Sequence, residues 1–112
     1  MAASDIPNLT LHALAARIKE RASAGAETSY TRKLLDRGIA HCAKKLGEEA
    51  VEVVIAAIDE DRERVIAEVA DLLYHLLVVL EARGIALGEV EAALSRRTTQ
   101  SGLEEKATRP RD

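Results

Sequence analysis

Apolar residues recur at every third or fourth position along most of this chain, which is the spacing of helices that bury one face. The first such segment is preceded by Asn8 and Thr10, either of which suits the capping position of a helix. Gly38 and Gly84 follow the second and fourth segments, where glycine readily adopts the left-handed conformation that ends a helix. The predicted helices cover about residues 10–21, 31–37 and 87–97, with a third from Ile39 to a turn near residues 59–61 and a fourth from that turn to about Arg83. The pattern therefore predicts an all-α fold, a bundle of about five helices built on a central antiparallel hairpin of the third and fourth.

Length and composition indicate one globular domain. The chain has 112 residues, a length sufficient for one hydrophobic core and too short for two. Its content of 47% hydrophobic and 31% charged residues is that of a globular protein. We expect a core over about residues 9–97 and a polar tail over 98–112. The longest apolar run, residues 72–80, is far shorter than the roughly 20 residues that cross a bilayer, so no membrane contact is expected. Residues 1–5 lack the pattern of a secretory signal, and the single cysteine, Cys42, cannot form an internal disulfide, so we expect a cytoplasmic protein.

The charge balance argues against nucleic acid as a partner. Sixteen basic and 19 acidic residues give a net charge of −3, so no general field attracts a polyanion. The chain has no Phe and no Trp, and Tyr30 and Tyr74 alone do not make a stacking surface for single strands. A small polyanionic ligand would therefore need a metal ion or a local basic cluster.

The fourth predicted helix is apolar on nearly all sides from Leu72 to Leu80, interrupted only by His75. Such a helix is covered on most of its surface. A chain of this length offers little material to surround one helix, so we favour a homodimer that shares this helix over a monomer with a central helix. Higher homo-oligomers remain an alternative.

Two acidic patterns lie on the predicted hairpin, Glu48-Glu49-x-x-Glu52 on its first helix and Glu68-x-x-Asp71 on its second. In an antiparallel hairpin that turns at residue 60, residues whose numbers sum to twice that value lie level with each other. The predicted level pairs are Glu52 with Glu68, Glu49 with Asp71, and Lys45 with His75. Four carboxylates therefore converge at roughly 12 Å from the turn.

The convergence of four carboxylates favours a metal site over a solvated acidic face. Solvated faces usually pair opposite charges, whereas these like-charged neighbours each cost a few tenths of a kcal/mol. Two such patterns side by side next to a core are unfavourable without a cation. Because carboxylate oxygens select a hard ion over zinc, the sequence predicts Mg²⁺ or Mn²⁺, with Mg²⁺ preferred.

Three further groups are candidates for substrate contacts. The segment that opens the second helix, which we call the lip, combines hydroxyls, cations and backbone N–H groups suited to phosphate. The lip consists of Ser29, Tyr30, Thr31, Arg32 and Lys33. Lys45 shares the face of the acids and either pairs with a neighbouring glutamate or contacts phosphate. His75 is either a partly buried structural residue or a substrate contact.

These motifs resemble those of the phosphoribosyl-ATP pyrophosphohydrolase family, over about residues 9–97. An EExxE string followed by ExxD marks the all-α nucleoside triphosphate pyrophosphohydrolase superfamily, to which that family belongs. The Ser-Tyr-Thr lip with its following leucines and glycine, and the LLYHLLV run, indicate this member of the superfamily. The matching stretches are residues 29–31, 34–35, 38, 45–53 and 68–78.

The resemblance implies the second step of histidine biosynthesis, in which phosphoribosyl-ATP and water give phosphoribosyl-AMP and pyrophosphate. It implies Glu49, Glu52, Glu68 and Asp71 as Mg²⁺ ligands and as catalytic residues. Glu48, turned further outward, becomes a second candidate for orienting a ligand or a water. Because four acids exceed what one Mg²⁺ normally takes, two or more ions are expected.

Two other functions remain open at this point. A house-cleaning pyrophosphohydrolase of the same superfamily would act on free or damaged nucleotides, and a comparison of phosphoribosyl-ATP with ATP and deoxynucleoside triphosphates separates the two. A non-catalytic helical dimerisation module would show no Mg²⁺-dependent turnover and no stabilisation by metal.

Overall fold

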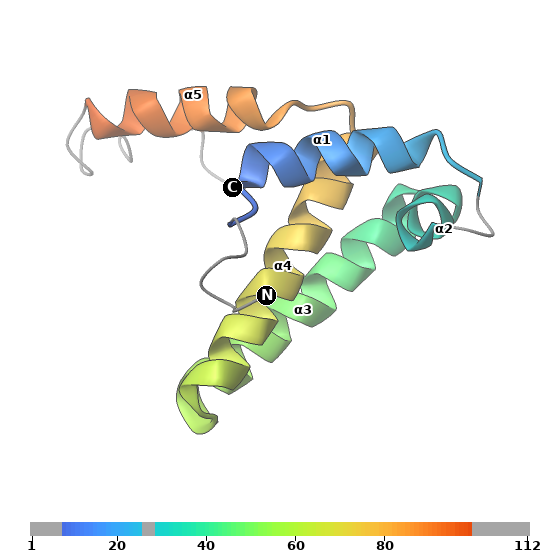
Figure 1. Cartoon of the computed structure of the whole chain (residues 1–112). Helices are drawn as coiled ribbons and strands as arrows, with labels where there is room; N and C mark the ends of the chain where they lie inside the picture. The colour runs from blue at the N-terminus through green and yellow to red at the C-terminus, as the bar shows by residue number, and fades with distance from the viewer. Residues whose placement is uncertain (1–7, 26–28, 100–112) are drawn as a thin grey trace.

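Five α-helices account for most of the described part of the chain, residues 8–25 and 29–99, in a computed structural model (Figure 1). The helices are α1 (Leu11–Ala22), α2 (Tyr30–Asp36), α3 (Ile39–Asp59), α4 (Arg62–Ala82) and α5 (Leu87–Thr98). No strand occurs within these ranges, so the predicted all-α fold is confirmed, with every helix end within about a residue of its expected place. The polar tail expected beyond α5 lies almost entirely outside the described residues.

Local hydrogen bonds explain where the helices begin. The Thr10 hydroxyl accepts a hydrogen bond from the N–H of Ala13 at 3.0 Å, and a carboxylate oxygen of Asp61 accepts one from the N–H of Arg64 at 2.9 Å. Each satisfies an N–H group that the first turn of a helix leaves without a partner. The positive φ of Gly38, +94°, lets the chain leave α2 and enter α3 through a tight turn.

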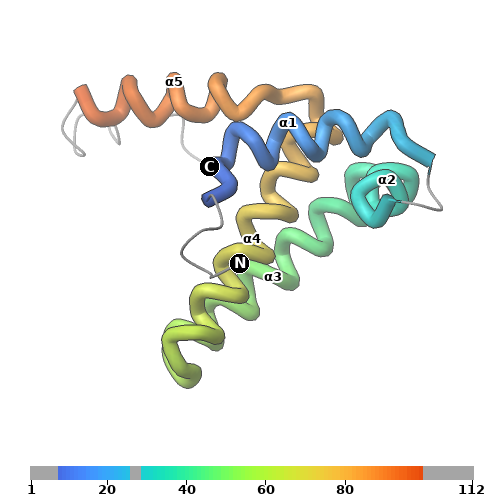
Figure 2. Tube along the Cα trace, in the orientation of Figure 1, coloured from blue at the N-terminus to red at the C-terminus, as the bar shows by residue number. Residues whose placement is uncertain are grey.

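The antiparallel α3–α4 hairpin is the centre of the fold, and α1 and α2 pack against the end remote from its turn (Figures 1 and 2). The buried core lies at that end and joins all four helices. Its members are Ile18, Leu34, Cys42, Leu77 and Val78. The fifth helix lies apart from the hairpin and is tied to α1 by a 2.8 Å contact between His12 Nε2 and a carboxylate oxygen of Glu91.

The apolar run Leu72–Leu80 is therefore covered in part by its own chain, because Leu77 and Val78 belong to this core. A larger uncovered apolar surface lies nearer the hairpin turn. There the exposed side chains, which we call the hairpin patch, are Val51, Val54, Ile55, Ile58 and Ile66. Within the described ranges, no helix is long and apolar enough to cross a membrane.

Candidate metal site and adjoining cleft

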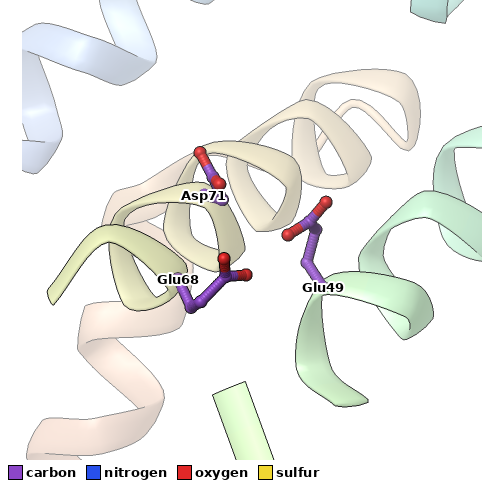
Figure 3. Close-up of side chains that lie close together, drawn as sticks. All are labelled: Glu49, Glu68 and Asp71. Atoms are coloured by element: carbon purple, nitrogen blue, oxygen red, sulfur yellow. The ribbon is translucent and has the colours of Figure 1, made fainter. Parts of the chain in front are cut away.

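Three carboxylates meet midway along the hairpin. Glu49 projects from α3 toward α4, which carries Glu68 and Asp71 one turn apart (Figure 3). One oxygen from each side chain lies within 4.8 Å of the others. Glu68 is only 5% exposed, Glu49 is half-buried and Asp71 is exposed, so the group opens to solvent on one side. The predicted convergence of Glu49 with Asp71 is confirmed.

The donor set fits a small divalent cation. All three donors are carboxylate oxygens, the ligands that Mg²⁺ prefers, and the exposed side leaves room for the waters that it keeps. Oxygens at about 2.1 Å from one ion lie roughly 3 to 4 Å apart, so small side-chain rotations close the observed spacing. The three residues form one group of carboxylate oxygens that could hold a metal ion.

Glu52 lies outside this group of three. It follows Glu49 by three residues, which places it about 60° away around the helix, and its side chain is exposed. The structure thus brings together three of the four predicted ligands, and the metal-binding role of Glu52 stays a prediction. Glu48 is also exposed, and its carboxylate lies 3.6 Å from the ammonium group of Lys45.

Arg64 supplies a positive charge to the buried carboxylate. Its guanidinium group lies 2.9 Å from Glu68 and 3.5 Å from Glu60, one turn away on the other side. The contact with Glu68 satisfies a carboxylate that would otherwise be buried among like charges. A cation bound at the three carboxylates would compete with this ion pair for the same Glu68 oxygens.

His75 is buried beside the carboxylates, and its Nδ1 atom has no hydrogen-bond partner among the described residues. Burial lowers the pKa of His75, and the positive charge of Lys45 lowers it further, while Glu49 and Asp71 act in the opposite direction. His75 is therefore held mostly neutral near pH 7. Its unpartnered nitrogen is available to a ligand that reaches it, so the predicted substrate contact of His75 stays open.

The lip residues make contacts within the protein. The Ser29 hydroxyl accepts a hydrogen bond from the Arg32 N–H at 3.1 Å and so caps α2. The Thr31 and Tyr74 hydroxyls lie 2.6 Å apart, and the Tyr30 ring stacks on Tyr74 with centroids at 6.4 Å. Burial raises the pKa of Tyr74, so its hydroxyl remains protonated across the neutral range.

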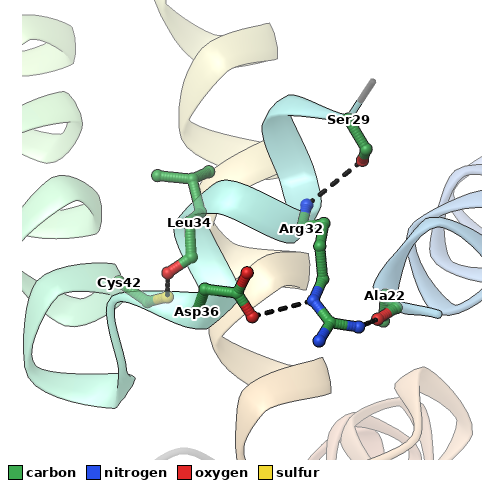
Figure 4. A network of polar contacts seen from close by, with 6 residues as sticks. All are labelled: Ala22, Ser29, Arg32, Leu34, Asp36 and Cys42. Carbon is green, nitrogen blue, oxygen red and sulfur yellow. Dashed lines mark hydrogen bonds and ion pairs between the residues drawn. The ribbon is translucent and has the colours of Figure 1, made fainter. Parts of the chain in front are cut away.

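The Arg32 guanidinium bridges two segments of the fold (Figure 4). Its Nε donates to Asp36 at 2.7 Å and its Nη1 donates to the carbonyl of Ala22 at 2.6 Å. These contacts tie the end of α1 to α2. Each of Ser29, Thr31 and Arg32 thus already has a structural contact, and substrate binding by these residues stays a prediction.

A cleft of about 580 Å³ opens beside the lip, between α2 and the start of α3. Of the residues predicted to bind substrate, Tyr30, Lys33 and Lys45 line it. Arg37 and His41 also line it, and the sequence reasoning did not select them. Arg37, His41 and Lys45 are spaced four residues apart, as residues on one face of a helix are. Because the chain turns at Gly38, this spacing alone does not establish that Arg37 lies on the same side as the other two.

The fold and the site are those of an all-α protein whose central helix hairpin carries three converging carboxylates. The family described as phosphoribosyl-ATP pyrophosphohydrolase matches residues 11–98, nearly the whole described chain. The chain belongs to this family and is a hydrolase.

Individual relatives extend the match over almost their full length. The phosphoribosyl-ATP pyrophosphatase 1 of Bradyrhizobium diazoefficiens is 67% identical over 104 residues, which cover 93% of this chain and 98% of the relative. The phosphoribosyl-ATP pyrophosphatase of Nitrobacter hamburgensis is 61% identical over 96% of this chain and 100% of its own. That of Ruegeria pomeroyi is 50% identical over 90% and 96%, respectively.

Proposed function

We propose that this protein hydrolyses phosphoribosyl-ATP to phosphoribosyl-AMP and pyrophosphate, the second step of histidine biosynthesis. The family match and the names of the relatives support the substrate and the reaction. The observation that carries the chemistry is the group formed by Glu49, Glu68 and Asp71, since a triphosphate is bound through a cation held by carboxylates.

Mg²⁺ is the cation that we propose for this group. Glu49, Glu68 and Asp71 would hold it, and the exposed Glu52, one turn further along α3, would join through a rotation of its side chain or hold a second ion. When bound, Mg²⁺ neutralises charge on the triphosphate and lowers the pKa of a water. Glu48, which precedes Glu49 in the sequence and is exposed, is our second candidate for orienting such a water.

The surrounding residues keep the site ready for this cation. Arg64 compensates the charge of the buried Glu68, a role that a bound cation would share. The core behind α4 fixes His75 next to the carboxylates and excludes water from that side. Because the ligands stand on two long helices, the protein positions them without reorganisation of a loop.

The direct test is a pyrophosphate-release assay with phosphoribosyl-ATP, with and without Mg²⁺. The proposal expects metal-dependent release, and kcat/KM for phosphoribosyl-ATP well above that for ATP and for deoxynucleoside triphosphates. Equal efficiency on all of these substrates would favour the house-cleaning alternative. No turnover, together with a melting temperature that Mg²⁺ leaves unchanged, would favour the non-catalytic helical module.

We also propose that the protein is a cytoplasmic homodimer. The hairpin patch supports the dimer, because exposed apolar side chains gathered on one half of a hairpin are typical of a surface covered by another subunit. Ile58, which is 76% exposed, is the most exposed of them. Light scattering is expected to report a dimer for the natural chain and a monomer for Ile58→Glu combined with Val54→Glu. A natural chain of monomeric mass at micromolar concentration would contradict the proposal.

A further inference from the structure

The cleft beside the lip is lined by basic side chains. Lys33 comes from α2, Arg37 from the end of α2, and His41 and Lys45 from successive turns of α3. The turn at Gly38, with its positive φ, brings the two helices together so that these side chains share one hollow. The whole chain is acidic, so this concentration of positive charge is local.

Part of the positive charge of the cleft is compensated, because the ammonium group of Lys45 lies 3.6 Å from a carboxylate oxygen of Glu48. Among the described residues that line the cleft, Asp36 is the one acid, and it already accepts a 2.7 Å hydrogen bond from Arg32. Within residues 8–25 and 29–99, neither Lys33 nor Arg37 forms an ion pair. Partial burial and the nearby charges of Arg37, Lys44 and Lys45 lower the pKa of His41, which agrees with a positive field in the cleft.

The cleft and the carboxylate group lie next to each other along α3. Lys45 lines the cleft and stands one turn of α3, about 6 Å, before Glu49. His41 stands one further turn away. One row along α3 therefore leads from cations in the cleft to the metal-binding carboxylates, so a single extended ligand can touch both.

We propose that the cleft binds the phosphate on the second ribose of the substrate, with Arg37 and Lys33 as its principal contacts. This inference rests on the proposed function, because that substrate carries two separate anionic ends. The metal site serves the triphosphate, and the second phosphate lies at the far side of the nucleoside. A phosphomonoester needs fixed cationic donors, which the cleft supplies and the carboxylate group cannot. These residues therefore distinguish phosphoribosyl-ATP from ATP.

The first experiment compares kcat/KM for phosphoribosyl-ATP and for ribosyl-ATP, which lacks the second phosphate. Arg37→Ala is expected to lower the value for phosphoribosyl-ATP by roughly 10- to 100-fold, the usual effect of losing a charge-assisted contact, and to leave ribosyl-ATP within about twofold. Lys33→Ala combined with Arg37→Ala is expected to make the two substrates nearly equal.

Lys44→Ala is the matched control, because it removes the same charge from an exposed position on α3 that does not line the cleft. It is expected to retain the preference of the natural enzyme. Melting temperatures of all variants check that the fold is retained. An unchanged ratio of the two substrates in the double variant, or an equal loss on both, would overturn the assignment, and an equal loss would indicate that the cleft contacts the base instead.

A binding experiment decides the same point without turnover. Ribose 5-phosphate is expected to shift the backbone NMR signals of residues 30–45 in the natural protein and in Lys44→Ala, but not in Arg37→Ala, while ribose shifts none of them. The absence of such shifts in the natural protein would overturn the cleft assignment even if phosphoribosyl-ATP is hydrolysed. Conversely, shifts without hydrolysis would leave the phosphate site standing and refute the proposed function.

Discussion

Replacing Asp71 by Asn is expected to change the stability of the protein in opposite directions with and without metal. Two unit charges 4.8 Å apart repel by about 1 kcal/mol in water, and by about 3.5 kcal/mol at an effective dielectric constant of 20. Asp71 is exposed, which favours the lower value, and Arg64 already offsets the charge of Glu68. The variant should therefore relieve about 1 kcal/mol in the metal-free protein, a rise in melting temperature of about 4 °C for a domain of this size.

With Mg²⁺ present, the natural protein should be more stable than Asp71→Asn. A ligand that binds only the folded protein stabilises it by about 2.7 kcal/mol at a hundred times its dissociation constant. Asp71→Asn removes one of three ligands, so its melting temperature should respond weakly to Mg²⁺, and Mg²⁺-dependent turnover should fall at least about 100-fold. Thermal unfolding followed by circular dichroism, over a series of Mg²⁺ concentrations and at low ionic strength, measures both effects on the same samples.

Glu20→Gln is the matched control, because it removes one exposed acid from α1, away from the carboxylate group. It is expected to leave the response to Mg²⁺ unchanged. An Asp71→Asn protein that melts below the natural one without metal, or that keeps the full Mg²⁺ response, would refute the argument that these carboxylates form a cation site. The same series on Glu52→Gln shows whether the fourth predicted ligand takes part: a lost response assigns it to the metal, and a retained response removes it from the site.

Three further predictions follow from single contacts. Arg64→Gln leaves the buried Glu68 without its counter-charge, so the metal-free protein should lose about 1–3 kcal/mol of stability, while half-maximal activity in a Mg²⁺ titration should need less metal. Tyr74→Phe removes the 2.6 Å hydrogen bond to Thr31, and chemical denaturation should report a loss of about 1 kcal/mol with no change in Mg²⁺ affinity. Burial raises the pKa of Cys42 and so favours its neutral thiol in the folded state. The free energy of unfolding should therefore fall as pH rises above the ordinary thiol pKa of about 8.5. A thiol reagent should label Cys42 in denaturant but only slowly in the native protein.

The parts of the structure that the sequence predicts well are those controlled by local rules. The start of α1 at Thr10, one of the two caps that the sequence offers, follows from capping, and the meeting of Glu49 with Asp71 follows from counting residues away from a short turn. Such arguments need only helical geometry.

The parts that escaped prediction depend on contacts between distant segments. Arg32 donates a hydrogen bond to the carbonyl of Ala22, because the end of α1 lies next to its guanidinium group. Arg37 belongs to the cleft only because the backbone at Gly38 turns with φ +94° and aligns α2 with α3. Periodicity within one helix carries no information on either arrangement, since each requires the relative orientation of two elements.

The segments of α3 and α4 that lie between the turn and the carboxylates, the two arms of the hairpin, have nearly equal lengths. The carboxylate group is therefore sensitive to the length of each arm. Ten residues separate Glu49 from the end of α3 and nine separate the start of α4 from Asp71, so the two arms measure about 15 and 14 Å. One residue inserted within either arm would carry its carboxylates 1.5 Å along the axis and 100° around it, away from their partners. An insertion of the same size in the turn at Glu60 and Asp61 would leave both arms unchanged. The chain can therefore change in length at that turn. Between the turn and the carboxylates, the number of residues in each helix is fixed, because it sets the position of the carboxylates.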